Sequence, residues 1–276
     1  MRGKTIVITG ATSGIGEVAA IRLAEQGARI IFTARDKERA DATLRKLRKA
    51  HDADHVFHLG DLSLLSEMIR IGGVLAREPV IDVLINNAGA LFSTRRETVD
   101  GLEATFALNH MSYFVITNLV LPVLKPGARI VSTSSRAHRR GTLDFADLQS
   151  RNGYRGLPVY CNSKLCNVLF NRELARRLSG SGVTANCLHP GFVATHFGDE
   201  SGGLLSLGVR IAKIFTGLSP EAGAKPIVYL ASSADVADAS GAYFYECKTD
   251  MPSDAARDDG AAKRLWQIST EISGVG

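Results

Sequence analysis

The sequence predicts an α/β protein, in which a doubly wound parallel sheet carries helices on both faces. Short runs rich in β-branched residues alternate with longer amphipathic segments along the chain. A glycine-rich turn follows the first of these runs and opens the first helical segment. Apolar strands separated by helices are typical of a parallel sheet that binds ligands at the carboxyl ends of its strands.

Seven short segments are expected to be strands, and longer segments between them are expected to be helices. The expected strands are Thr5–Thr9, Arg29–Thr33, His55–His58, Asp82–Asn86, Ala128–Ser132, Val183–Leu188 and Ala242–Tyr245. The expected helices include Gly14–Gln26, Lys37–Ala50 and Leu102–Leu124. Neither an internal repeat nor a low-complexity linker divides the chain, so residues 1–276 are expected to form one domain.

Composition indicates a soluble globular protein, because 45% of the residues are hydrophobic and 22% are charged. The formal net charge is +5, but the basic residues do not form one block, so no nucleic-acid partner is expected. The longest apolar stretch, around Tyr113 to Leu124, is too short and too interrupted to span a bilayer. No signal-peptide pattern opens the chain.

Cysteine and histidine spacing exclude several classes of site. The four cysteines have no CxxC spacing, and the seven histidines form no HExxH motif, so no catalytic metal is expected. Unpaired thiols are typical of a cytoplasmic protein, which is the expected location. The GxSxG motif of serine hydrolases is absent as well.

The glycine-rich turn after the first strand is a candidate phosphate site. Its spacing is GxxxGxG, which differs from the common GxGxxG fingerprint. Glycines here let the backbone turn tightly, approach a pyrophosphate and pack the helix on the sheet. The N-terminus of that helix offers N–H groups and a positive dipole end to phosphates. We therefore expect a Rossmann-type dinucleotide site with Gly10, Thr12, Ser13, Gly14, Ile15 and Gly16 in contact with the cofactor.

The end of the second strand bears on the choice between NADP(H) and NAD(H). The strand is expected to end at Ala34, and Arg35 follows it. A guanidinium suits a 2′-phosphate by bidentate hydrogen bonding, so NADP(H) is preferred. Asp36 supports the alternative, because a shift of one residue would direct its carboxylate at the ribose hydroxyls and favour NAD(H).

Several motifs in a fixed order resemble those of the short-chain dehydrogenase/reductase family. They are the glycine turn, Asn86-Asn-Ala-Gly89, Gly60-Asp61-Leu62, Asn109, the serine pair Ser134-Ser135, the Tyr160/Lys164 pair and Pro190-Gly191-Phe-Val-Ala-Thr195. The resemblance extends from Thr5 to about Ile272. Their joint order, rather than any single motif, is specific to the family.

Within that family the chain is similar to the branch that contains the retinol dehydrogenases and the WW-domain oxidoreductase. An insertion with Asp144-Phe-Ala-Asp-Leu148, the segment YCNSKLCNVLFNRELARRL and the tail segments SGAYFYECK and ARDDGAAKRLWQIS carry this similarity. Vertebrate retinol dehydrogenases of this type resemble membrane-anchored proteins, whereas this chain begins without an apolar anchor. No membrane span is therefore expected, and the resemblance does not identify retinoids as the substrate.

The resemblance implies a set of catalytic and cofactor-binding residues. The implied catalytic residues are Asn109, Ser135, Tyr160 and Lys164. Beyond the glycine turn and Arg35, the implied cofactor contacts are Asp61, Leu62, Asn87, Ala88, Gly89, Tyr160, Lys164, Pro190, Gly191, Val193 and Thr195. By the same resemblance Lys164 binds the nicotinamide ribose, and Asn109 anchors a water molecule that relays protons through Lys164. The alternative for Asn109 is an ordinary position on a helix surface.

Tyr160 and Lys164 are four residues apart, so in a helix they lie on one face. An ammonium about 5 Å from a phenolate, at an effective dielectric constant near 20, stabilises it by roughly 3 kcal/mol. We therefore expect the pKa of Tyr160 to lie about two units below the usual value near 10. Such a tyrosine could exchange a proton with a substrate oxygen while the cofactor exchanges a hydride.

Ser134 and Ser135 point to opposite faces if they lie in a strand, so only one of them can reach the substrate. Family sequences place the active serine just before the small or polar residues of the following loop, which favours Ser135. Its hydroxyl would stabilise the charge that develops on the substrate oxygen.

These residues predict an NADP(H)-dependent oxidoreductase that acts on an apolar aldehyde, ketone or alcohol. The alternative is a redox sensor or scaffold that binds the nucleotide without turnover, although a complete set of catalytic residues argues against it. The segment His196–Leu218 is expected to be a substrate lid, with a surface helix packed on the core as the alternative. A homodimer or a homotetramer is compatible with the sequence, which does not identify the substrate or the direction of the reaction.

Overall fold

The computed structural model describes residues 1–191 and 219–276. The expected lid at 196–218 lies outside the described residues, as do the expected cofactor contacts Val193 and Thr195.

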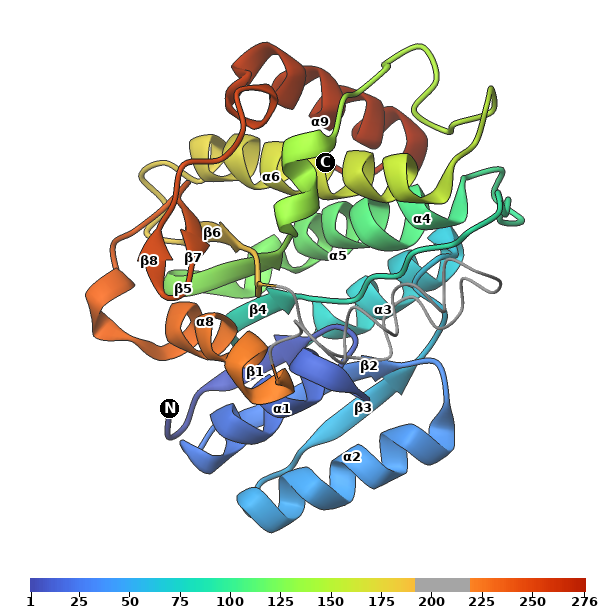
Figure 1. The fold of residues 1–276 in the computed structure, drawn as a ribbon. Helices are drawn as coiled ribbons and strands as arrows, with labels where there is room; N and C mark the ends of the chain where they lie inside the picture. The colour runs from blue at the N-terminus through green and yellow to red at the C-terminus, as the bar shows by residue number, and fades with distance from the viewer. Residues whose placement is uncertain (192–218) are drawn as a thin grey trace.

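The described strands form one eight-stranded sheet in the order β3-β2-β1-β4-β5-β6-β7-β8 (Figure 1). Neighbouring strands from β3 through β7 are parallel, and β8 is antiparallel to β7. The bounds are β1 Thr5–Ile8, β2 Arg29–Ala34, β3 Val56–Leu59, β4 Ile81–Asn86, β5 Leu124–Thr133, β6 Thr184–Leu188, β7 Tyr243–Tyr245 and β8 Lys248–Thr249. The α/β class is confirmed, and the sheet differs from the expected one by the antiparallel edge strand β8.

The helices lie in two layers that sandwich the sheet (Figure 1). Side chains of α1, α2 and α8 pack in one buried cluster, and those of α3, α5 and α6 pack in another, with α9 outside α6. The bounds are α1 Gly14–Glu25, α2 Lys37–Ala50, α3 Leu65–Leu75, α4 Ala104–Phe106, α5 Ser112–Val120, α6 Gly156–Arg177, α8 Pro220–Ser232 and α9 Asp259–Ser273. Short 3-10 turns are η2 Leu121–Val123, η3 Arg136–Arg140, η5 Ala234–Val236 and η6 Ala255–Arg257.

The expected continuous helix over Leu102–Leu124 is interrupted. It consists of α4, a π-helical turn (η1, Ala107–Met111), α5 and the 3-10 turn η2. Pro122 lies in η2, where it lacks the N–H that an α-helix would use. The π turn contains Asn109, and such turns often occur at functional sites.

The same helical segment bears on whether the chain could span a membrane. Among the described residues, Ala104–Val123 has the length and apolar composition of a membrane-spanning helix. However, 72% of its most apolar window is buried inside the protein, which is the pattern of a core helix.

The order of the strands places a ligand crevice above β1 and β4. These neighbouring strands lead into connections that run to opposite sides, since β1 leads toward β2 and β4 leads toward β5. In doubly wound sheets the ligand lies at such a switch point, outside the carboxyl ends of the strands. The glycine turn after β1 and the Asn86–Gly89 segment at the end of β4 therefore meet at one edge of the sheet.

Candidate active site

The glycine turn leaves no room for larger side chains at two of its positions. Gly10 has a φ angle of +69°, and a Cβ atom there would lie 2.9 Å from the Cα of Ala88. A Cβ atom on Gly16 would collide with the carbonyl oxygen of Gly10 and with Nδ2 of Asn87. Only glycine fits either position without a shift of the backbone. The predicted turn after β1 is therefore present and packs directly on the segment after β4.

Thr9 and Asn87 tie the ends of β1 and β4 together. The Thr9 hydroxyl accepts hydrogen bonds from the backbone N–H groups of Asn87 at 2.9 Å and Ala88 at 3.1 Å. The Asn87 side-chain amide donates to the carbonyl oxygens of Thr9 and Gly10, both at 3.1 Å. Thr9 was not among the residues predicted from the sequence, because its role depends on a strand that follows it by almost eighty residues. The two segments form one braced unit.

The N-terminus of α1 is suited to an anion. Ser13 occupies the N-cap position and is exposed, and its side chain makes no capping hydrogen bond. Thr12 and Ile15 are half-buried beside it. The first N–H groups of a helix need partners, and an anion at this position would supply them along with a favourable interaction with the helix dipole.

The end of β2 shows where Arg35 and Asp36 lie. The strand ends at Ala34, as the sequence predicts, and Arg35 is exposed directly after it. The Asp36 carboxylate caps α2 by accepting the backbone N–H of Arg39 at 2.8 Å. That carboxylate already has a structural use, which weakens the alternative in which it binds ribose hydroxyls.

Asp61 and Leu62 follow β3 at the same edge of the sheet. One carboxylate oxygen of Asp61 accepts both the backbone N–H and the hydroxyl of Ser63, at 2.9 and 2.8 Å. Leu62 is buried in the core. At the other end of this edge, Pro190 and Gly191 follow β6, and Gly191 has a φ angle of +83°.

Lys164 lies one helical turn after Tyr160 in α6, as predicted. Its ammonium nitrogen is 5.8 Å from the centre of the Tyr160 ring and donates a hydrogen bond to the carbonyl oxygen of Thr133 at 3.1 Å. Only 3% of Lys164 is exposed, and this burial lowers its pKa to about 8. A buried lysine with a lowered pKa is a frequent feature of functional sites.

The expected lowering of the Tyr160 pKa is wrong for the protein alone. Burial raises the pKa of Tyr160 above its usual value, and a side-chain hydrogen bond to Ser135 opposes this increase. The free-energy cost of removing a phenolate from water exceeds the stabilisation that it gains from the hydrogen bond to Ser135. The phenol is therefore held in its protonated form, which is the form that donates a proton.

The structure distinguishes the two serines. The Ser134 hydroxyl is buried and donates to the backbone carbonyl of Lys164 at 2.7 Å. Both serines follow the end of β5 at Thr133, and Ser135 is the one whose side chain forms a hydrogen bond with Tyr160. Its oxygen also accepts the backbone N–H of Ala137 at 3.1 Å, which fixes the side chain at the start of η3. Ser135, the serine chosen from the sequence, therefore lies beside Tyr160.

Asn109 is buried, so the alternative of an ordinary surface asparagine is wrong. Its side-chain oxygen accepts the N–H of Ala90 at 2.8 Å, and its amide donates to the carbonyl of Ala90 and the hydroxyl of Ser163, both at 2.9 Å. Asn109 thus holds the segment after Gly89 against α6. Gly89 itself is close to both groups, since a Cβ atom there would lie 3.1 Å from the Asn109 oxygen and 3.3 Å from the Lys164 ammonium.

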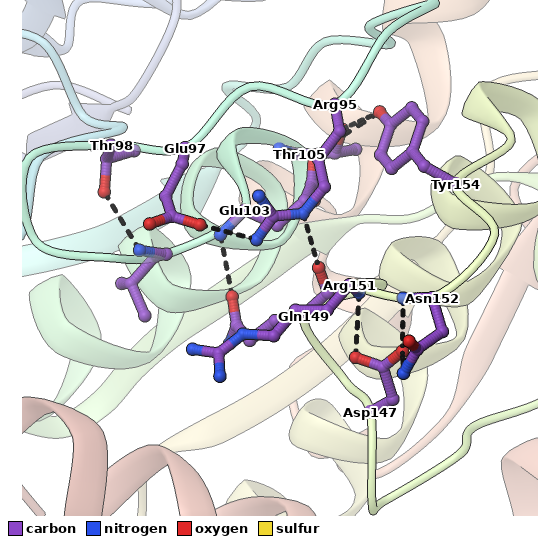
Figure 2. Close-up of polar contacts among 11 residues, drawn as sticks. Arg95, Glu97, Thr98, Glu103, Thr105, Asp147, Gln149, Arg151, Asn152 and Tyr154 are labelled. Carbon is purple, nitrogen blue, oxygen red and sulfur yellow. Dashed lines mark hydrogen bonds and ion pairs between the residues drawn. The ribbon is translucent and has the colours of Figure 1, made fainter.

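A second brace, which sequence reasoning missed, joins the insertion before α6 to the helix that carries Asn109. Figure 2 shows it around Glu103, which is fully buried. The Glu103 carboxylate accepts the N–H groups of Thr105 and Phe106 at 2.8 and 2.7 Å, and its own N–H donates to the Gln149 side chain at 2.7 Å. The Tyr154 hydroxyl lies 3.4 Å from the same carboxylate. We call Glu103, Gln149 and Tyr154 the insertion brace.

The arrangement combines three chemical capacities at one edge of the sheet. The glycine turn and the α1 N-terminus suit a diphosphate. Tyr160 holds a proton beside the Ser135 hydroxyl, and the Lys164 ammonium lies 5.8 Å from the centre of the Tyr160 ring. Among the described residues no group of three or more His, Cys, Asp or Glu side chains is arranged to hold a metal ion. Proton transfer to an oxygen beside a bound dinucleotide is the chemistry that this site supports.

Comparison with known proteins supplies evidence that does not depend on the geometry of the site. A family model described as short chain dehydrogenase matches residues 4–202. Human retinol dehydrogenase 13 is 42% identical over 283 residues, which cover 99% of this chain and 85% of that protein. Human retinol dehydrogenase 14 is 40% identical, with 100% of this chain and 88% of that protein covered.

Solved structures agree with the fold. An uncharacterized protein from Mycobacterium paratuberculosis superposes with a TM-score of 0.80 at 32% identity, covering 99% of this chain and 94% of that chain. A short chain dehydrogenase from Burkholderia cenocepacia in complex with NADP has a TM-score of 0.70 at 25% identity, with 88% and 96% covered.

Proposed function

The chain belongs to the short-chain dehydrogenase family, and on this premise we propose that it is an NADP(H)-dependent oxidoreductase that interconverts an apolar alcohol with its aldehyde or ketone. The observation that carries the proposal is the Ser135–Tyr160 hydrogen bond, together with the Lys164 ammonium 5.8 Å from the centre of the Tyr160 ring. This group of side chains lies at the same sheet edge as the glycine turn.

In the proposal the chain's own residues manage the proton and the charge on the substrate oxygen. A bound nicotinamide supplies or accepts the hydride. During reduction, Ser135 and Tyr160 donate hydrogen bonds to the carbonyl oxygen, and Tyr160 transfers its proton as negative charge develops there. The Lys164 ammonium stabilises the phenolate that remains. During oxidation Tyr160 takes the proton back.

Asn109 is proposed to act through the positions of its neighbours. Both N–H groups of its side-chain amide already bind Ala90 and Ser163, so the amide donors hold the protein rather than a water molecule. The proposal therefore keeps Asn109 in the site as the residue that fixes Gly89 and the segment after it beside Lys164. Its expected part in a proton relay remains a prediction.

The proposed preference for NADP(H) rests on the end of β2. Arg35 is exposed after the last strand residue, while Asp36 caps α2. A short chain dehydrogenase of the same fold was solved in complex with NADP, which supports the proposal.

Arg35→Ala should weaken NADPH binding by about 1.5–3 kcal/mol, as expected for loss of a charge-assisted hydrogen bond, and leave NADH binding nearly unchanged. The matched control is Arg39→Ala, which removes another exposed arginine from the first turn of α2. Equal losses for NADPH and NADH in Arg35→Ala would contradict the preference.

The proposed apolar substrate follows from the relatives, among them the two human proteins named retinol dehydrogenase 13 and 14. Retinol is an apolar alcohol, although the chemistry of the site does not require that particular molecule. A cytoplasmic location remains part of the proposal, and it agrees with the four free cysteines. A homodimer or homotetramer remains compatible with it.

A substrate panel tests the proposed function. The protein is mixed with NADPH, binding is followed by cofactor fluorescence, and aliphatic and aromatic aldehydes and ketones of increasing length are then added. We expect oxidation of NADPH, with kcat/KM increasing as methylene groups are added, by up to about 0.8 kcal/mol for each methylene that is buried. Binding of NADPH without turnover of any alcohol or carbonyl would instead indicate a nucleotide-binding sensor or scaffold.

A further inference from the structure

Three buried side chains without a role in the proposed reaction meet at the ends of three adjacent strands. His138 lies in η3 after β5, His189 directly follows β6, and Tyr243 opens β7. Each is at most 3% exposed. Buried groups of this kind need partners, and here they find one another.

The backbone fixes the tautomer of His138. Its Nδ1 lies 2.8 Å from the carbonyl oxygen of Ser135, which can only accept a hydrogen bond. Its Nε2 lies 3.2 Å from the backbone N–H of Ser253, which can only donate. His138 must therefore carry its single proton on Nδ1 and be neutral. The burial that lowers its pKa agrees with this assignment.

The direction of the remaining hydrogen bonds follows from that tautomer. The Tyr243 oxygen is 3.2 Å from Nδ1 of His138, so it accepts a share of the same N–H. Its own proton is then directed at Nδ1 of His189, which is 2.8 Å away. Nδ1 of His189 must be unprotonated, and the proton of this ring lies on Nε2. Burial lowers the pKa of His189 to about 4, so the ring is neutral at physiological pH. Electrostatic interactions with His138, Arg139 and Arg136 lower this pKa further, and Asp250 alone among these neighbours raises it.

Packing holds the two rings in this arrangement. The His189 ring stacks with two tyrosine rings, with centre-to-centre distances of 5.4 Å to Tyr243 and 4.2 Å to Tyr245. Tyr245 contacts the face of His189, but the hydrogen bonds of the chain pass through Tyr243 alone. The two tyrosines therefore form a matched pair for experiment.

The chain of hydrogen bonds connects two parts of the candidate site. At one end, His138 holds the backbone carbonyl of Ser135 through both its ring and its own N–H, the latter at 3.0 Å. At the other end, His189 directly precedes Pro190 and Gly191, the expected cofactor contacts. The backbone supports the same link, because the N–H of Ser134 donates to the carbonyl of Leu188 at 2.7 Å.

We propose that His138, Tyr243 and His189 form a positioning relay, which holds the Ser135 hydroxyl in one place relative to the cofactor-binding turn at Pro190–Gly191. The relay touches neither substrate nor reacting atoms, and it acts through the segments at its two ends. Its effect on turnover rests on the proposed function, whereas its effect on cofactor affinity and on the histidine tautomers does not.

Tyr243→Phe removes the central hydroxyl and keeps the ring, so it interrupts the relay with the least change in packing. We expect kcat to fall five- to twentyfold and the Kd for NADPH to rise at least threefold. Tyr245→Phe is the control, and both values should stay within twofold of the wild type. A Tyr243→Phe variant with kcat and Kd within twofold of the wild type overturns the proposal, even if its melting temperature is lower.

Two substitutions at His189 separate positioning from packing. Asn retains a side-chain oxygen that can accept the Tyr243 proton, whereas Leu fills the space without an acceptor. His189→Asn should recover at least half of the wild-type kcat, and His189→Leu should behave as Tyr243→Phe does. Equal kcat values for the two variants would show that hydrogen bonding at this position does not matter and would overturn the proposal.

The tautomers can be measured in the wild-type protein, whether or not it turns over a substrate. Nitrogen-15 NMR at neutral pH should show one histidine protonated on Nδ1 and a second protonated on Nε2, and both signals should change in Tyr243→Phe. His138→Gln and His189→Asn assign the signals by loss. If His138 carries its proton on Nε2, or His189 carries its proton on Nδ1, the relay as proposed does not exist. Failure of the proposed function would instead appear as correct tautomers in a protein that oxidises no NADPH.

Discussion

The glycine turn and the insertion brace hold the same edge of the sheet by different physical means. At the glycine turn, the segments that follow β1 and β4 lie so close together that a Cβ atom at Gly10 would collide with the backbone of Ala88, and one at Gly16 with the Gly10 carbonyl. At the insertion brace, a buried carboxylate satisfies backbone N–H groups, and contacts to Gln149 and Tyr154 join it to a loop about fifty residues away. Close backbone packing, reinforced by the Thr9 and Asn87 hydrogen bonds, therefore positions the cofactor side, and hydrogen bonds to a buried carboxylate position the side near Asn109.

The glycine turn and the insertion brace therefore tolerate different substitutions. Where two backbone segments lie this close, only glycine fits, and a larger residue displaces the backbone near it. A buried charge depends on every one of its partners, so its loss leaves several unpaired groups at once. Substitutions at the turn should act mainly on cofactor affinity, and substitutions in the brace should act mainly on folding.

The largest expected effect is at the turn. Gly16→Ala should weaken NADPH binding at least a hundredfold, about 3 kcal/mol, because the new methyl group displaces the Gly10 carbonyl and so distorts the turn that would hold the phosphates. Gly73→Ala in α3 is the matched control, since a Cβ atom there meets no other atom within 4 Å. That control should bind NADPH normally and gain about 0.5–1 kcal/mol in stability. A Gly16→Ala protein with an NADPH affinity within threefold of the wild type would show that sterics do not position the turn.

The next effect concerns the insertion brace. Glu103→Ala leaves the N–H groups of Thr105 and Phe106 buried without partners and should lower the free energy of unfolding by about 2–3 kcal/mol in urea. Glu97→Ala, which removes a carboxylate that is half-exposed, should cost less than about 1 kcal/mol. Figure 2 shows both carboxylates. Equal costs for the two variants would contradict the distinction between buried and exposed carboxylates.

A smaller effect tests the cost of the buried cation beside Tyr160. The folded pKa of Lys164, about 8, lies below the value near 10.5 of an exposed lysine, so charging it in the folded protein is unfavourable. The cost is fully present below pH 8 and disappears as the pH rises from about 8 to 10.5. Lys164→Met should therefore be more stable than the wild type by about 2 kcal/mol at pH 7, after allowance for the lost hydrogen bond to Thr133.

The Thr133 carbonyl remains satisfied in that variant, because the Tyr113 hydroxyl and the Asn167 amide also donate to it. Denaturant unfolding of both proteins at pH 7 and pH 10 measures the difference, which should shrink at the higher pH. Lys49→Met, on the exposed face of α2, should show no such dependence on pH. A stability difference that stays constant or grows with pH would contradict a buried, destabilised ammonium.

The same contrast explains what could be predicted from the sequence. Gly10 and Gly16 could be predicted, because a tight backbone turn between a strand and a helix needs glycine. The end of β2 at Ala34 could also be predicted, since the apolar run stops there and charged residues follow. The proximity of Tyr160 and Lys164 could be predicted as well, since a spacing of four residues in a helix places them on one face. The choice of Ser135 came from family resemblance, and the structure supports it through the contact with Tyr160.

Features that depend on distant partners could not be predicted. Glu103 looks like an ordinary acidic residue until the insertion folds over it. His138 and His189 lie more than fifty residues apart, and only the neighbouring strands β5, β6 and β7 bring them to the same tyrosine. The pKa of Tyr160 was predicted in the wrong direction, because spacing along a helix gives the distance to a cation but not the cost of burial.

The central claim is that Tyr160 gives its proton to the substrate oxygen, and one substitution tests it most directly. Tyr160→Phe keeps the ring and removes only the hydroxyl. Rapid mixing of the NADPH-bound variant with the best carbonyl of the panel should show a rate of NADPH oxidation about 10²–10⁴-fold below the wild type, while the Kd for NADPH stays within twofold. A wild-type rate in Tyr160→Phe would contradict the assignment of Tyr160 as the acid and with it the proposed mechanism.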